Sequence, residues 1–203
     1  MALSYDQIQK ALTGNKTSPL PDDSLTRAAV ALILRTVPSG MEILFIERAA
    51  HPEDPWSGNL GFPGGKVESG DGSERQTAER ETCEEIGLDL EKAEYLGRIP
   101  DIIGAHLPVS ISCFVYGLVR PAHLVLEDEV KSAFWFPLDQ LQNPDRHLAA
   151  TVNFDGREMT SPAIRILAPG QTVLWGITYR LVISFIEILA GSGLISPITI
   201  SPE

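Results

Sequence analysis

The sequence predicts an α+β fold (mixed α/β). Residues 28–37 and 41–48 are apolar, β-rich runs on either side of Pro38-Ser39-Gly40, a pattern typical of a β-hairpin. Residues 73–87 have the composition of a capped helix, and residues 177–190 form a more apolar helical stretch. Because strands and helices follow one another without regular β-α alternation, a simple parallel sheet is not expected.

Length and composition predict one domain over residues 1–203. With 43% hydrophobic residues, the chain is too apolar to be mainly disordered. Residues 1–24 are expected to hold a short amphipathic helix and a connector, and residues 191–203 a tail. The two cysteines are too few for a disulfide scaffold. No secretory signal is found, so a cytoplasmic protein is expected.

The charge balance limits the partners of the protein. Lys and Arg number 16 and Asp and Glu number 27, so the net charge is −11. An extended nucleic acid backbone or an anionic membrane needs a basic surface, so neither is expected as a partner. A substrate that carries phosphate would be repelled as well, unless a cation is bound nearby.

The remaining elements come from local patterns. An acidic turn is expected at 127–131, directly before a strand. The apolar helix at 177–190 is expected to pack in the core, with a homodimer interface as the alternative. Further elements are expected as a helix at 4–13, strands at 59–62, 93–103, 109–119 and 134–136, a short helix at 137–141, and a late hairpin of 147–154 with 163–167.

The helix at 73–87 is the most clearly defined element. Ser73 is a suitable N-cap, and Gln76 follows at the spacing of a capping box. Gly87 is a suitable residue to end the helix in a left-handed conformation. The segment just before it, Pro63-Gly64-Gly65, is expected to halt the strand at 59–62 and to let the backbone approach a ligand closely.

Three carboxylates converge on one face of this helix. At about 100° per residue, Glu81, Glu84 and Glu85 share an arc that is separate from the small and apolar residues. Arg80 lies four residues before Glu84 and can pair with it. One interpretation is a solvated acidic face. The other is a site for Mg²⁺ or Mn²⁺, which prefer carboxylate oxygens, with the carbonyl of Gly64 as a further ligand.

Loop and helix together resemble the signature of the Nudix hydrolase family. The matching residues are Gly65, Arg80, Glu81, Glu84, Glu85, Gly87 and Leu88. The chain departs from the pattern in two places: eight rather than seven residues separate Asp71 from Arg80, and Thr82 replaces an aliphatic residue. The longer loop is similar to that of the coenzyme A pyrophosphatase branch of the family.

The resemblance implies a Nudix-type α/β/α sandwich with a mixed central sheet and extra terminal helices. It implies hydrolysis of a diphosphate bond by water that Mg²⁺ (or Mn²⁺) activates, with the metal on Glu81, Glu84, Glu85 and the carbonyl of Gly64. Catalytic roles are expected for Glu84, Glu85, Arg80 and Glu129. The general base in the family is a glutamate of the signature or an acid from a distant loop, and Glu129 is the candidate for the latter, with a solvated surface charge as the alternative.

Binding residues for the substrate are expected around the loop. Arg48 and Lys66 flank it and can meet phosphate, whereas Arg80 is expected to orient Glu84. Phe62 can stack on a base, with core packing as the alternative. The expected partner is a small nucleotide diphosphate substrate.

The segments at 44–49 and 58–65 resemble the motif that precedes the signature in the coenzyme A pyrophosphatase branch, as does Trp175-Gly176-x-Thr178. That branch has an arginine shortly after the pair that matches Arg48-Ala49, and this chain has none there. Coenzyme A or an acyl-CoA is therefore the first expectation. NADH, ADP-ribose, a nucleotide sugar or a dNTP are alternatives, as is a non-catalytic module that senses a nucleotide.

Overall fold

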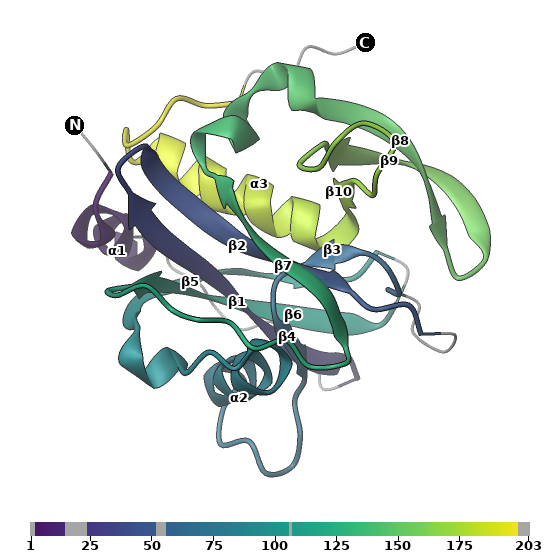
Figure 1. Cartoon of the computed structure of the whole chain (residues 1–203), viewed down its shortest axis with the longest axis horizontal. Coiled ribbons are helices and arrows are strands. Elements are labelled where there is room, and N and C mark those ends of the chain that lie inside the picture. The colour runs from purple at the N-terminus through teal and green to yellow at the C-terminus, as the bar shows by residue number, and fades with distance from the viewer. Residues whose placement is uncertain (1–2, 15–23, 52–55, 106, 199–203) are drawn as a thin grey trace.

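A mixed β-sheet forms the centre of the molecule (Figure 1). The computed structural model describes residues 3–14, 24–51, 56–105 and 107–198, so most of the expected connector and the last five residues lie outside it. The strands of this sheet are β1 (Thr26–Val37), β2 (Gly40–Arg48), β3 (Leu60–Gly61), β4 (Gly64–Lys66), β5 (Glu94–Ile103), β6 (Val109–Leu118) and β7 (Val130–Pro137). Their order is β3-β2-β1-β6-β5, with β4 paired to β1 and β7 to β2. Strands β1 and β6 run parallel, and the other pairs are antiparallel.

Helices cover both faces of the sheet. Helix α2 (Glu74–Ile86) lies on one face, and α1 (Tyr5–Gly14) and α3 (Gly176–Gly191) lie on the other (Figure 1). The sequence of strand β1 is apolar because both of its faces are buried. Ala29 and Ile33 pack on the side of α2, whereas Leu32 and Leu34 pack on the side of α1 and α3. The expected α/β/α sandwich and mixed sheet are confirmed.

A second, smaller sheet differs from the expectation. It consists of β8 (His147–Phe154), β9 (Arg157–Ile164) and β10 (Leu174–Trp175). The partner of β8 was expected at 163–167, but only Ala163 and Ile164 of that range pair with it, because β9 begins directly after Asp155-Gly156. Both turn residues have positive φ, 52° and 72°, which is the geometry of a tight hairpin turn. The early part of β9 is polar and was not recognised as a strand.

The segment at 64–66 also differs, because it was expected as a loop and forms β4. Its residues pair with Ala28–Val30 of β1 in antiparallel register. The short helix expected at 137–141 is a 3₁₀ turn. This turn is η2 (Asp139–Gln142). Two further 3₁₀ turns are η1 (Leu90–Lys92) and η3 (Pro144–Arg146). Helices α1 and α3 form as expected, and α3 is buried along one side against the sheet. No helix within the described ranges is long and apolar enough to cross a membrane.

Candidate active site

Helix α2 is fixed at both ends by local hydrogen bonds. The Oγ atom of Ser73 accepts a bond from the backbone N–H of Gln76 at 3.3 Å. The side chain of Gln76 in turn accepts from the N–H of Gly72 at 2.8 Å rather than from Ser73, so the loop before the helix is held as well. Gly87 ends the helix with φ 66° and donates to the carbonyl of Cys83 at 2.9 Å.

Arg80 donates hydrogen bonds to three carboxylates of the loop and of helix α2. Its Nη1 donates to Glu81 at 3.0 Å and to Glu84 at 2.8 Å, and its Nε and Nη2 donate to the two oxygens of Asp71 at 3.0 Å each. Asp71 also accepts from the hydroxyl of Thr77 at 2.9 Å. These bonds, above all those from Arg80, hold the pKa of Asp71 well below its usual range. Arg80 therefore contacts Glu84 as expected, and Asp71 fixes the loop.

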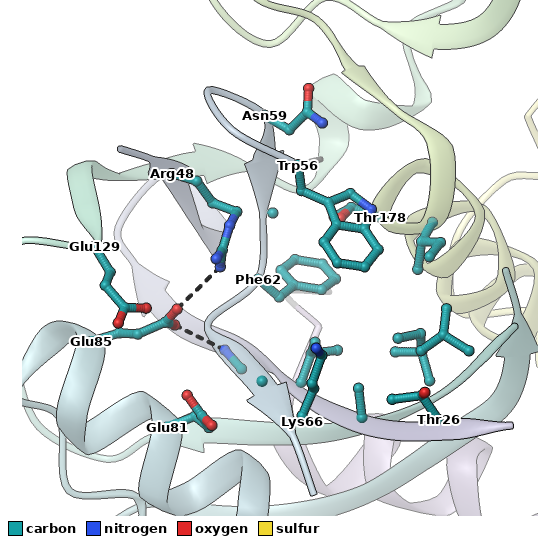
Figure 2. Close-up of a pocket in the computed structure, with 18 of the residues that line it drawn as sticks. Thr26, Arg48, Trp56, Asn59, Phe62, Lys66, Glu81, Glu85, Glu129 and Thr178 are labelled. Carbon is teal, nitrogen blue, oxygen red and sulfur yellow. Dashed lines mark hydrogen bonds and ion pairs between the residues drawn. The ribbon is translucent and has the colours of Figure 1, made fainter. Parts of the chain in front are cut away.

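Glu85 is the buried carboxylate of the site, with 3% of its surface exposed. Its Oε2 accepts from the N–H of Gly64 at 2.9 Å, and its Oε1 lies 3.4 Å from Nη1 of Arg48 (Figure 2). Burial raises the pKa of Glu85 to about 7, and the charges of Glu81 and Glu129 act in the same direction. The bond from Gly64 and the charge of Arg48 compensate only in part.

Gly64 and Gly65 link strand β4 to the acidic residues. The N–H of Gly64 donates to Glu85, so this end of β4 is joined to α2 as well as to β1. The expected role of its carbonyl as a metal ligand stays a prediction. Gly65 lies against the carboxylate of Glu81, where a Cβ atom would leave no room for it.

Glu129 comes to the site from a distant loop. The N–H of Glu127 donates to the carbonyl of Glu85 at 3.1 Å, and the N–H of Ala49 donates to the carbonyl of Glu129 at 2.9 Å. The loop is thereby tied to the end of α2 and to the end of β2. The Glu129 side chain lies beside Glu85 in Figure 2, and its charge raises the pKa of both Glu81 and Glu85.

These residues border a cleft of about 770 Å³ that has an acidic and an apolar half (Figure 2). The charged side chains of the acidic half are Glu81, Glu84, Glu85, Glu129, Arg48 and Arg80. The apolar half is lined mainly by Val30, Leu107, Val109, Ile111, Ile177 and Leu181. Lys66 borders the cleft from β4. Phe62 borders it too, but it is 4% exposed and stacks on Phe45 with ring centroids 5.3 Å apart.

The acidic half contains the carboxylate oxygens that a divalent cation prefers, but they are not arranged around one point. Within the described residues, no group of three or more His, Cys, Asp and Glu side chains is arranged to hold a metal ion. The reason is that each carboxylate has a protein partner: Glu81 and Glu84 turn to Arg80, and Glu85 turns to Gly64 and Arg48. Glu84 is 59% exposed, although it accepts the bond from Arg80.

The apolar half was not identified from the sequence. It combines residues from the first parts of β1 and β6 with the start of α3, which are far apart in the chain. Asn59 stabilises this arrangement, because its Oδ1 accepts a bond from Nε1 of Trp175 at 3.1 Å. The motif that contains Trp175 and Thr178 was the available signal.

Comparisons with known proteins agree with this arrangement. The family model of the NUDIX domain matches residues 25–155, well over half of the chain. The peroxisomal coenzyme A diphosphatase ndx-8 of Caenorhabditis elegans is 40% identical over 94 residues, 44% of this chain and 39% of that protein. Nudix hydrolase 3 of the same organism is 29% identical over 138 residues, 64% of this chain and 56% of that protein. The matches cover between 34% and 65% of the length of the curated relatives.

A solved structure extends the similarity to nearly the whole chain. A MutT/nudix family protein from Enterococcus faecalis aligns with 94% of this chain and 76% of its own, with a TM-score of 0.56 and 18% identity, which shows a shared fold. The NUDIX match includes the central sheet, helix α2 and the loop of Glu129. The chain belongs to the Nudix hydrolase family.

Proposed function

We propose that the chain hydrolyses a diphosphate bond in a nucleoside diphosphate derivative with the aid of Mg²⁺ (or Mn²⁺). The observation that carries the proposal is the buried carboxylate of Glu85 beside Glu81 and Glu129 at the edge of an open cleft. An excess of negative charge in a site of low polarity is unfavourable unless a cation compensates it. Carboxylate oxygens are the ligands that Mg²⁺ prefers, so the donor set fits this ion.

The ion would be held by Glu81, Glu84, Glu85 and the carbonyl of Gly64. When bound, it supplies the positive charge that a diphosphate needs and lowers the pKa of a coordinated water. Arg80 keeps Glu81 and Glu84 on the cleft side of α2. Arg48, which lies 3.4 Å from Glu85, and Lys66, on β4, also line the cleft and would bind diphosphate oxygens.

We assign the general base to Glu129. Its backbone is anchored to Ala49, and its side chain is exposed to the cleft next to Glu85. It can therefore accept the proton of the attacking water while Glu85 stays fixed by Gly64. Glu84 and Glu85 act in this scheme by holding the cation, and Arg80 acts by orienting Glu84.

The substrate that we propose first is coenzyme A or an acyl-CoA. The segments before and after the signature that resemble the coenzyme A branch, together with the name of the nematode diphosphatase, support this choice. The arginine of that branch is absent after Arg48-Ala49, so NADH, ADP-ribose, a nucleotide sugar and a dNTP belong in the same test.

Three further expectations accompany the proposal. We propose that residues 1–203 act as one domain, because α1 and α3 pack on the same sheet as the site. A homodimer, and a small molecule rather than nucleic acid or membrane as partner, stay predictions. The cytoplasmic location is a prediction too, and the peroxisome named for one relative gives a second compartment to compare by cell fractionation.

The test is phosphate-bond hydrolysis on a panel of coenzyme A, an acyl-CoA, NADH, ADP-ribose, a nucleotide sugar and dNTPs with Mg²⁺. Turnover of at least one member is expected, and Glu85→Gln should lower kcat by at least about 10²-fold. Glu91→Gln removes an equal charge at an exposed position in η1 and should leave kcat unchanged. Mg²⁺ binding without turnover would indicate a nucleotide-sensing module instead. No Mg²⁺ binding at all would refute both.

A further inference from the structure

A second pocket adjoins the active-site cleft. It has a volume of about 220 Å³ and lies between the small sheet of β8, β9 and β10 and the first turn of α3. Six residues line both spaces and form their common wall: Trp56, Asn59, Leu60, Leu107, Ile177 and Thr178. Figure 2 shows Trp56, Asn59 and Thr178 together on the side of the cleft away from the glutamates. The two spaces are therefore direct neighbours.

The wall of the pocket is fixed in advance. The ring of Trp175 meets Phe154 edge to face, with centroids 6.1 Å apart and planes at 81°. Its Nε1 donates to Oδ1 of Asn59 at 3.1 Å. The carbonyl of Asn59 accepts from the N–H of Arg48 at 3.0 Å, so the pocket is connected through one residue to the acidic half of the cleft. A preformed pocket binds a ligand at a low entropic cost.

The chemistry of the lining favours a group without hydrogen-bonding edges. The apolar members include Trp56, Leu60, Phe154, Met159 and Trp175. The side chains of three polar members are engaged elsewhere. Asn59 binds Trp175, Ser161 donates to the carbonyl of Pro162 at 3.3 Å, and Arg180 donates to the carbonyl of Ile103 at 2.7 Å. The hydroxyls of Thr178 and Tyr179 also line the pocket, but apolar surface predominates, so an aliphatic group, which needs no hydrogen bonds, suits it better than a nucleobase, which needs several.

We propose that this pocket, which we call the tail pocket, binds an uncharged aliphatic group carried by one end of the diphosphate substrate. The inference rests on the proposed hydrolysis in the neighbouring cleft, since the diphosphate must lie in the acidic half for its tail to reach the pocket. The tail pocket then selects among diphosphates by the length and polarity of the group farthest from the reacting bond.

The probes are alkyl esters of ADP on the terminal phosphate, from methyl to decyl. They share one diphosphate and differ only in tail length. Once the tail reaches the pocket, kcat/KM should rise by up to about fourfold for each added methylene, and it should level off when the pocket is full. Methylenebisphosphonate analogues of the same esters, which cannot be hydrolysed, give the length dependence of Kd by calorimetry, independently of turnover.

Two neighbouring residues of β9 provide a matched pair of variants. Ser161 lines the tail pocket, and Thr160 points to the other face of the strand because side chains alternate. Ser161→Leu fills the pocket and should abolish the gain for long tails while the methyl ester is turned over as before. Thr160→Leu adds the same group outside the pocket and should retain the full length dependence. Met159→Ala enlarges the pocket and should move the plateau to longer tails.

Each outcome separates the tail pocket from the proposed hydrolysis. Turnover of the methyl ester without any dependence on tail length would overturn the tail pocket and leave the hydrolase intact. Absence of turnover, with a length dependence of Kd that Ser161→Leu removes, would support the tail pocket and overturn the hydrolase. Equal losses in Ser161→Leu for all esters would refute the assignment. If Ser161→Leu does not fold, an unchanged plateau in Met159→Ala refutes it equally.

Discussion

Alanine at Gly64 and alanine at Gly65 perturb two different parts of the site, although the residues are neighbours in β4. At Gly64 the backbone has φ 151°, which side chains rarely adopt. A Cβ atom there would overlap the carbonyl oxygen of Ala29 and lie 2.6 Å from Cα of Val30. Backbone strain and overpacking each cost about 1–3 kcal/mol, so Gly64→Ala should lower the free energy of unfolding by about 2–6 kcal/mol.

At Gly65 the obstacle is the end of a side chain. A Cβ atom would lie 2.6 Å from Oε2 of Glu81, whose carboxylate can rotate away. The loss of its bond to Arg80 on a partly exposed surface costs at most about 1 kcal/mol. The displaced carboxylate, however, is a proposed metal ligand. Since a shift of about 1 Å in a catalytic group can cost about 10²-fold in rate, Gly65→Ala should lose activity and keep its stability.

The assay pairs thermal unfolding of the metal-free protein with Mg²⁺-dependent turnover. For a chain of this size about 1 kcal/mol corresponds to about 2–4 °C, so Gly64→Ala should melt at least about 4 °C below the wild type. Gly65→Ala should melt within about 4 °C of it and bind Mg²⁺ more weakly. Gly70→Ala, where a Cβ atom meets nothing within 4 Å, is the control for both. Full activity in Gly65→Ala, or wild-type melting of Gly64→Ala, would refute the reasoning.

Three other predictions concern single contacts. Because Arg80 holds the pKa of Asp71 below its usual range, the charged carboxylate stabilises the fold at neutral pH. Urea titrations should therefore show that Asp71→Asn is less stable than the wild type at pH 7. The difference in stability should shrink as the pH falls below 3.8. Glu129→Gln should reduce kcat by about 10²-fold or more, while the Kd for Mg²⁺ changes little. Trp175→Phe keeps an aromatic ring but removes the indole N–H and its bond to Asn59, so differential scanning calorimetry should show a loss of at least about 1 kcal/mol.

Local signals predicted the helix of the site well. Ser73 and Gly87 cap α2 as expected, because both caps act within one turn of the chain. Even here one detail depends on the fold: Gln76 bonds to Gly72 rather than completing a capping box on Ser73. The carboxylates of the helix follow from its register alone, since α2 exposes Glu81 and Glu84 on the cleft side once its apolar face meets the sheet.

Pairing between distant strands could not be predicted in the same way. The backbone of β4 is extended because β1 offers it hydrogen-bonding partners, and nothing within Gly64–Lys66 favours a strand. Strand β9 begins with polar residues at the edge of the fold, where the alternation that marks a buried strand is absent. Asp155-Gly156 was a usable signal for this hairpin, since that dipeptide favours positive φ at both positions.

The two halves of the cleft differ in how far the sequence could predict them, again because local patterns do not contain contacts between distant segments. The acidic half consists largely of one helix and the loop before it, so its residues are close in sequence and in space. Arg48, on β2, and Glu129 come from elsewhere, and the resemblance to the family rather than its spacing pointed to Glu129. The apolar half needs the parallel pairing of β1 with β6 and the packing of α3 against both, which no local pattern contains.

Three of the acids that contribute to the net charge of −11 lie together in this site. Glu81, Glu84 and Glu85 have protein partners in Arg80, Arg48 and Gly64, and these partners compensate the charge of the carboxylates only in part. A divalent cation that binds Glu85 would compete with Arg48 for the same oxygens. Arg48 lines the cleft, where its guanidinium can pair with a diphosphate. Cation and anionic substrate should therefore bind cooperatively, since each removes a charge that opposes the other.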